Sequence, residues 1–148
     1  MASVHDVAAY ILKKMRASIS TMKLQKLVYY SQAWSLVWDE RPLFNEKIEA
    51  WVNGPVVREL YEEHRGSYDV SNWPKGNPDA LDAVAKETVD AVLKYYGEKG
   101  GQWLSDLTHM ERPWKDARKG LGPTDRSATE ITNAMLLEYY GGLQAPQS

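Results

Sequence analysis

The segment Met22–Trp38, MKLQKLVYYSQAWSLVW, decides the fold class of this chain. Drawn as a helix, it carries apolar side chains around most of its circumference. Its four strongly polar residues are Lys23, Gln25, Lys26 and Gln32. A surface helix has one apolar stripe, whereas a helix that is apolar nearly all round is covered by neighbours on several sides. We therefore expect residues 22–38 to form the central buried helix of a small domain.

The segments around this helix indicate a mainly α, single compact domain over residues 1–148. Helical spacing, capping residues and helix-ending glycines bound the expected helices. These helices cover residues 3–16, 55–65, 77–96, 102–110, 114–119 and 127–140. One small β-hairpin is expected over residues 43–52, from the extended pieces Leu43–Phe44 and Ile48–Val52. Residues 141–148 are expected to be a frayed tail.

Composition limits the classes of protein to which the chain can belong. Its 148 residues are 43% hydrophobic and 26% charged, as in an ordinary globular domain. No apolar run approaches the ~20 residues needed to cross a bilayer, and the N-terminus lacks the features of a signal peptide. The absence of cysteine excludes disulfides, thiolate nucleophiles and cysteine-based zinc sites. We expect a cytoplasmic protein with no membrane segment.

The sequence contains no recognisable catalytic, cofactor or metal motif. Its three histidines are too far apart for a paired metal helix, and no phosphate-binding loop or nucleophile elbow occurs. One polar constellation, Leu104–Arg118, has two interpretations. In an enzyme, His109 would act as a general base oriented by Glu111 or Asp116. In the alternative, which we favour, these groups fix a helix junction, and we expect no enzyme, cofactor or metal.

The N-terminal segment raises nucleic-acid binding as a second possibility. Residues 1–41 carry six Lys or Arg against three Asp or Glu. The basic group comprises Lys13, Lys14, Arg16, Lys23 and Lys26. However, the pI of 5.9 is far below the ~9 typical of a dedicated nucleic-acid domain. A solvated basic face is therefore favoured over a DNA-binding transcriptional regulator.

Three blocks of sequence, taken in order, carry a family resemblance. They are KLQKLVYYSQAW (residues 23–34), PLFNEKIEAWVNGPVVRELYEEHRG (42–66) and LSDLTHMERPWKDAR (104–118). Together they resemble the Panacea domain, the SocA-like antitoxin family of bacteria and their phages. With the closing helix, the resemblance covers residues 4–140.

The resemblance implies an antitoxin that binds a protein toxin directly and suppresses it without catalysis. The toxin would be the product of the adjacent gene. The type member is also described as a proteolytic adaptor that delivers its toxin to a protease, and these residues do not separate an adaptor from a simple blocker. Homo-oligomerisation is left open.

Aromatic residues supply the candidate contacts with such a partner. The chain has six Trp and nine Tyr but one Phe, and Trp and Tyr combine an apolar body with a polar tip that suits interfaces. The candidates lie at the hairpin–helix corner, in the loop 67–77 and at the second helix junction. They are Trp51, Asn53, Tyr61, Trp73, His109, Trp114 and Arg118. For Trp51 and Trp114 a core role is favoured instead, whereas for Trp73 the two roles are evenly matched.

Overall fold

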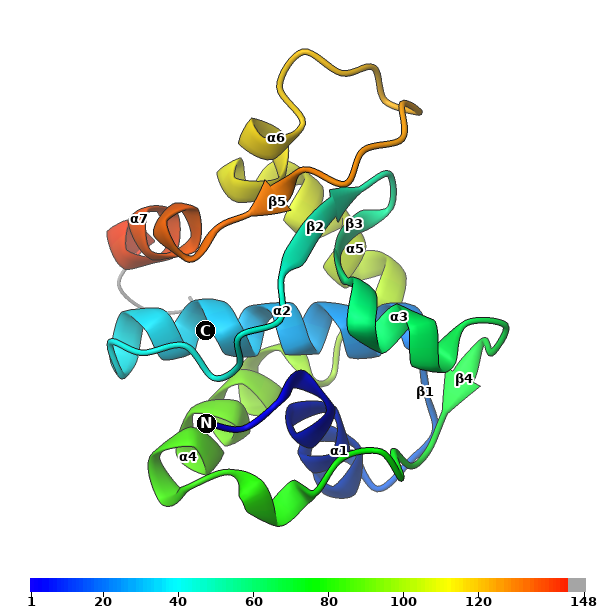
Figure 1. Ribbon diagram of the computed structural model, residues 1–148, viewed down its shortest axis with the longest axis vertical. Coiled ribbons are helices and arrows are strands. Elements are labelled where there is room, and N and C mark those ends of the chain that lie inside the picture. Colours follow the sequence, from blue (N-terminus) through cyan, green and yellow to red (C-terminus); the bar gives the residue numbers. More distant parts are fainter. Residues whose placement is uncertain (144–148) are drawn as a thin grey trace.

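Helix α2 (Thr21–Trp38) runs through the middle of the molecule and the other elements pack around it (Figure 1). The computed structural model describes residues 1–143. Every residue of α2 from Leu24 to Leu36 is buried. The expected central helix and the mainly α fold are therefore confirmed.

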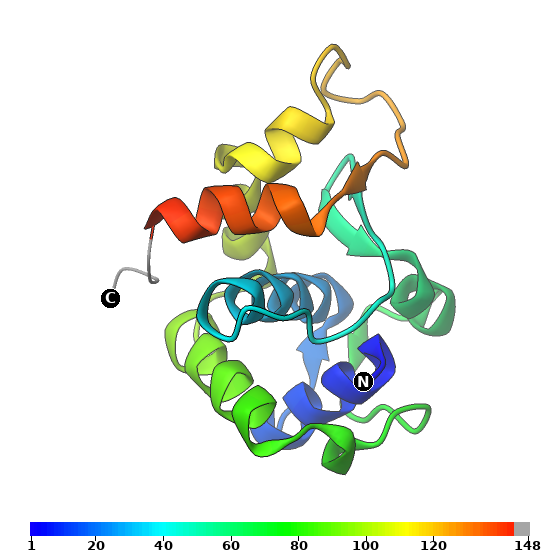
Figure 2. The ribbon, with the colours of Figure 1, turned by 60° about the vertical axis from the view of Figure 1, so that its left-hand side comes forward.

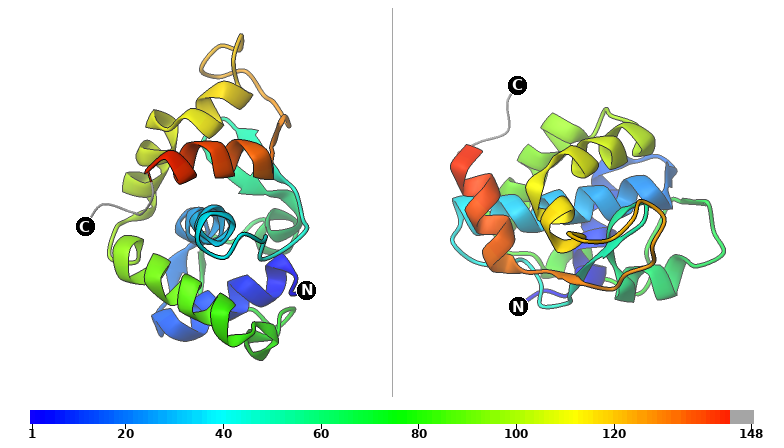
Figure 3. Two further views of the ribbon diagram at one scale, coloured as in Figure 1. Left: turned by 90° about the vertical axis from the view of Figure 1, so that its left-hand side faces the viewer. Right: turned by 90° about the horizontal axis from the view of Figure 1, so that it is seen from above.

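Two layers of structure enclose α2, as the end-on view shows (Figure 3). Helices α1 (Val4–Met15) and α4 (Ala83–Tyr96) lie on one side. Helices α5 (Gly101–Met110), α6 (Arg112–Ala117) and α7 (Asn133–Leu143) lie with the small sheet on the other. Figure 2 shows the same separation from another direction. None of the helices described for residues 1–143 combines the length and hydropathy required of a bilayer-spanning segment.

Two polar residues of α2 are buried because they bind the backbone of the segment that follows the helix. The Gln32 side-chain oxygen accepts hydrogen bonds from the amides of Leu43 (2.7 Å) and Phe44 (3.3 Å), and its amide donates to the Phe44 carbonyl (2.9 Å). Two turns earlier, Gln25 accepts from the Val57 amide (2.9 Å) and donates to the Val57 carbonyl (3.2 Å). Buried polar groups require such partners. The glutamines therefore fix both ends of residues 43–57 against α2.

The hairpin differs from the expected one over residues 43–52. Strand β2 (Ile48–Trp51) pairs with β3 (Gly54–Val57), with Ile48 opposite Val57 and Trp51 opposite Gly54. The prediction was wrong because Gln32 takes the amides of residues 43 and 44, which leaves them no strand partner. Gly54 enters β3 with φ of 122°, a conformation that favours glycine.

The sheet is completed from a distant part of the chain. Strand β5 (Glu130–Ile131) pairs with β2, so the strand order is β3-β2-β5. A second, two-stranded sheet joins β1 (Ile19–Ser20) to β4 (Asp69–Val70), which lies in the expected loop. Pro55 is accommodated because β3 is an edge strand, where a missing N–H is tolerated.

Four expected helices have different bounds. Helix α6 (Arg112–Ala117) begins and ends two residues earlier than the expected helix over 114–119. Helix α3 (Arg58–His64) begins after β3 rather than at residue 55. The helix predicted over 77–96 is split into the 3₁₀ turn η1 (Pro78–Ala80) and α4, because Leu81 is extended and Asp82 caps the second piece. Helix α7 starts after β5 and continues past Gly141 and Gly142. The rest of the predicted frayed tail, 144–148, lies outside the described residues.

A polar cluster sits inside the core between α2, α7 and the junction of α5 with α6. The hydroxyls of Tyr30 and Tyr140 each donate to Glu111 Oε1 at 2.7 Å, and Tyr29 is hydrogen-bonded to Tyr140. Burial raises the pKa of the Glu111 carboxyl, and the two tyrosine hydrogen bonds lower it only in part. Glu111 is therefore a component of the core.

Replacing Glu111 by glutamine should change how stability depends on pH. The raised pKa means that the folded protein holds the Glu111 proton more tightly than the unfolded chain does. Its contribution to stability is then fully present below the ordinary pKa of 4.5 and is lost as pH rises through the folded value. The unfolding free energy of the wild type minus that of Glu111→Gln should fall as pH rises above 4.5. Urea denaturation at several pH values measures this difference, and a rise with pH would contradict the assignment.

Candidate functional site

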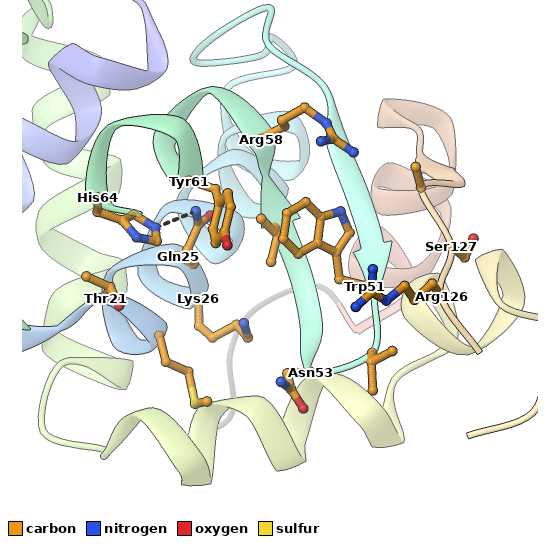
Figure 4. Close-up of a pocket in the computed structure, with 14 residues that line it drawn as sticks. Thr21, Gln25, Lys26, Trp51, Asn53, Arg58, Tyr61, His64, Arg126 and Ser127 are labelled. Carbon is orange, nitrogen blue, oxygen red and sulfur yellow. Dashed lines mark hydrogen bonds between the residues drawn. The ribbon is translucent and has the colours of Figure 1, made fainter. Parts of the chain in front are cut away.

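A pocket of about 780 Å³ opens at the corner between α2, the β2–β3 hairpin and α3 (Figure 4). Its fourth wall is the segment that leads into β5. The lining side chains are Thr21, Met22, Gln25, Lys26, Trp51, Val52, Asn53, Val56, Arg58, Tyr61, His64, Arg126, Ser127 and Ala128. Three candidates from the sequence, Trp51, Asn53 and Tyr61, are thus brought together here.

The aromatic wall of the pocket is held in place by its neighbours. Trp51 donates from Nε1 to Glu49 Oε1 (2.8 Å), and the Tyr61 ring meets it edge-on with centroids 4.9 Å apart. The Arg58 guanidinium lies 5.3 Å from the Trp51 ring centroid and pairs with Glu49 at 2.9 Å. Burial alone would raise the pKa of Glu49, but the hydrogen bonds from Arg58 and Trp51 lower it. Trp51 is therefore preorganised, with its ring partly exposed.

Lys26 lines the pocket from α2 although only 2% of its surface is exposed. Its ammonium group donates to the Pro55 carbonyl at 3.3 Å. Burial lowers the pKa of Lys26 to about 8, because the charged form is poorly solvated. Gly54 makes room for this side chain: a Cβ there would lie 2.7 Å from Lys26 Cε.

His64 closes the inner end of the pocket. Its Nε2 lies 3.0 Å from the side-chain amide nitrogen of Gln25 (Figure 4). Since that amide nitrogen is a donor, Nε2 acts as the acceptor, and the imidazole is neutral. Burial lowers the pKa of His64, and the charge of Lys26 lowers it further. This histidine therefore adds no second buried charge beside Lys26.

Three further candidates support the hairpin from behind. Arg118 Nη1 donates to the Ala50 carbonyl (3.0 Å), and Trp114 Nε1 donates to the Trp51 carbonyl (2.8 Å). His109 Nε2 faces the Val52 carbonyl (3.1 Å), and the Ser105 hydroxyl donates to the Asn53 carbonyl (2.7 Å). Four consecutive carbonyls, 50 to 53, are thus held by side chains of α5, α6 and the residue that follows α6. We call the four side chains of Ser105, His109, Trp114 and Arg118 the carbonyl clamp.

The geometry does not support His109 as a general base. Its ring nitrogens face the carbonyls of Ser105 and Val52, and its ring packs on Trp114 with centroids 4.0 Å apart. Neither Glu111, which binds tyrosines in the core, nor Asp116, which pairs with Arg112 at 3.5 Å, orients it. No cluster of three or more metal-binding side chains occurs within residues 1–143.

Trp73, in the loop 67–77, is buried and is not available at the surface for a partner. Only 6% of its surface is exposed, and its Nε1 donates to His5 Nδ1 at 3.1 Å. Its ring also lies edge-on to His64, with centroids 6.3 Å apart. Trp73 therefore packs beneath the loop and does not line the pocket.

The structure divides the N-terminal basic group into two parts. Lys26 is buried in the pocket, and Lys23 donates to the Gly97 carbonyl at 2.6 Å. Lys13 and Lys14 lie 3.8 Å from Asp79 and Asp90, respectively. Lys13, Lys14 and Arg16 nevertheless stay together, because they line one hollow with Tyr10 and Lys86. The expected basic group is therefore kept in part, without Lys23 and Lys26.

Sequence reasoning missed Lys26 and Arg126 as pocket residues. The position of Lys26 could have predicted a polar site, because a charged residue within a helix that is buried all round must face a polar group. Arg126 carried none, since its place depends on the pairing of β5 with β2, which joins residues far apart in the chain.

Comparison with known proteins yields one match. The family model described as "Antitoxin SocA-like, Panacea domain" matches residues 24–115, which extend from α2 into α6. No curated protein and no solved structure matches the chain. The matched range includes Lys26, the hairpin and α3. It also includes every residue of the carbonyl clamp except Arg118. The match covers more than half of the sequence, and the chain therefore belongs to the SocA-like antitoxin family with the Panacea domain.

Proposed function

We propose that this protein is an antitoxin that neutralises a protein toxin, encoded by the adjacent gene, by binding it directly. Membership of the SocA-like antitoxin family is the observation that carries the proposal. We assign the contact to the face that bears the pocket, because it combines half-buried aromatic side chains with an exposed cationic one.

The composition of the pocket supports a protein–protein contact. Binding energy at interfaces is concentrated in a few Trp, Tyr and Arg residues that fit into well-packed sites. Trp51, Tyr61 and Arg58 line this face, and Trp51 contacts both of the others. The carbonyl clamp fixes the hairpin before binding, which reduces the entropy lost on association.

Co-expression with the adjacent gene tests the proposal. The adjacent product should arrest growth when expressed alone, and co-expression of this protein should restore growth. Replacing Tyr61 by alanine should weaken binding of the purified toxin by about 30-fold, since a tyrosine at the centre of an interface contributes on the order of 2 kcal/mol. Isothermal calorimetry with an inactivated toxin measures the affinity, and the growth assay measures rescue.

Tyr68 provides the matched control, because it is a tyrosine outside the pocket with 81% of its surface exposed. Tyr68→Ala should rescue growth and bind as the wild type does. An adjacent product that is toxic but not rescued by the wild type would refute the proposed function. Wild-type binding by Tyr61→Ala would place the contact on another face.

Direct blocking and adaptor-mediated degradation make different predictions in cells. A blocker keeps the toxin inactive at an unchanged level, including in strains that lack individual ATP-dependent proteases. An adaptor lowers the amount of toxin and fails in the strain that lacks its protease. Immunoblotting of the toxin beside the growth assay separates the two mechanisms.

A further inference from the structure

Lys26 places a buried positive charge at the pocket, and no residue in 1–143 neutralises that charge. Within residues 1–143 its ammonium group makes one hydrogen bond, to the Pro55 carbonyl, and no ion pair. An ammonium group has three donors, so two N–H groups remain for a ligand. In Figure 4 the side chain extends into the space between Trp51 and Asn53. A buried charge without a counter-charge is unfavourable, which indicates that its partner comes from another molecule.

The rest of the lining has the same sign. Lys26 and Arg126 contribute positive charge, the charge of Arg58 is offset by its partner Glu49, and none of the lining residues is Asp or Glu. Glu49 pairs with Arg58 beside the pocket but does not reach Lys26. The whole chain carries a formal charge of −2, so the pocket is a local inversion of charge. Such a site attracts and orients an acidic group.

The uncharged part of the lining indicates what carries that acidic group. Met22, Trp51, Val56 and Tyr61 supply apolar and aromatic surface to the same lining as Lys26. A carboxylate on a short aliphatic arm would cover these apolar walls while its oxygens reach Lys26. A free inorganic anion would leave the walls uncovered.

We propose that this pocket receives an aspartate or glutamate side chain of the protein partner, with its carboxylate on Lys26. The inference rests on the proposed function, since it names the chemistry by which the same site holds the toxin. A charge-assisted hydrogen bond in a desolvated pocket is stronger than one on the surface. The acidic side chain would therefore be an anchor of the complex.

Replacing Lys26 by methionine tests the proposal with an inactivated product of the adjacent gene as the probe. Removing one partner of a buried charge pair should weaken binding by about 30-fold or more. The free variant should fold and be at least as stable as the wild type, because a buried charge is replaced by an apolar side chain of similar length. Calorimetry gives the affinity, and thermal unfolding of the free protein gives the stability.

Lys23→Met is the matched control. Lys23 lies on the same helix and also donates to a backbone carbonyl, that of Gly97, but it does not line the pocket. This variant should bind the toxin as the wild type does. Replacement of each exposed Asp and Glu of the toxin by its amide should identify one residue whose effect vanishes in the Lys26→Met background.

Each outcome has a separate meaning. If the wild type does not bind the toxin, the proposed function fails. If the wild type binds and Lys26→Met binds equally well, the proposed function stands and the inference about the acidic side chain is overturned. If inorganic phosphate binds the free wild type but not Lys26→Met, and its presence leaves the affinity for the toxin unchanged, the pocket takes a free anion, and the side-chain occupant is again refuted.

The same complex should weaken at alkaline pH. A carboxylate binds the protonated form of Lys26, whose pKa is about 8 in the free protein, so affinity should fall between pH 7 and 9. The other charged or titratable groups that face Lys26 are His64 and Tyr61 on α3, with Arg58 and Arg126 at the rim. Lys26→Met retains all four of these groups, so its affinity should change less over this range. An equal pH dependence in both proteins would assign the effect to a group other than Lys26.

Discussion

Replacing Gly76 by alanine should destabilise the fold by about 3 kcal/mol or more, because its Cβ would make the shortest contact of any glycine in the chain. A Cβ at Gly76 would lie 1.9 Å from the carbonyl oxygen of His5 and 2.9 Å from the amide of Asp6. Both contacts are with backbone atoms of α1, which cannot move aside as a flexible side chain would. In a chain of 148 residues, this loss corresponds to a fall in Tm of roughly 6–12 °C.

The close approach at Gly76 holds the loop that covers Trp73. The Gly76 amide donates to the Trp73 carbonyl at 3.1 Å, and the next amide, of Asn77, donates to Asp6 at 2.8 Å. Gly142→Ala is the control, because Gly142 is helical and a Cβ there meets nothing within 4 Å. Its Tm should be unchanged or slightly higher. Calorimetric scans of the three proteins measure the difference, and equal Tm values for Gly76→Ala and the wild type would contradict the described contact with α1.

Replacing Trp34 by alanine should lower the free energy of unfolding by about 3–5 kcal/mol, because it empties a large volume at the centre of the core. Trp34 is fully buried on α2, donates from Nε1 to the Tyr96 hydroxyl at 3.0 Å and packs edge-on to Tyr140. This loss is a large part of the ~5–15 kcal/mol that stabilises a typical domain. Urea denaturation measures it.

Two further variants separate the volume of the indole from its hydrogen bond. Trp34→Phe keeps a ring but leaves the Tyr96 hydroxyl without its donor, so its effect should be smaller than that of alanine. Trp103→Ala is the control, since that indole is 46% exposed on α5. Its effect should stay below about 1 kcal/mol. A Trp34→Ala protein as stable as Trp103→Ala would show that α2 is not the centre of the core.

The buried helix could be predicted from the sequence, whereas the hairpin beside it could not. An apolar surface on all sides of residues 22–38 has one physical meaning, and it specified both the helix and its central place. The strand register depended on where backbone amides find partners. Gln32 binds the amides of residues 43 and 44, and secondary-structure propensity does not predict those hydrogen bonds.

The pocket could be predicted only in part for a similar reason. Trp51, Asn53 and Tyr61 were identified because they lie close together along the chain at one corner. Arg126 comes from the segment before β5, which reaches the hairpin only through a pairing across about 80 residues. His109, Trp114 and Arg118 were identified as a polar junction, but a sequence does not show that three such side chains reach successive carbonyls.

The carbonyl clamp has a consequence for how recognition by this domain could be altered. The four donors bind main-chain oxygens of residues 50–53, and those oxygens remain whichever side chains occupy these positions. Substitutions at Trp51 and Asn53 should therefore change the surface offered to a partner while the path of the hairpin stays fixed. The main chain of residues 50–53 receives the supporting hydrogen bonds, whereas the side chains of Trp51 and Asn53 are available to a partner. A library randomised at these two positions could be selected against new partners, with the rest of the domain as a constant frame.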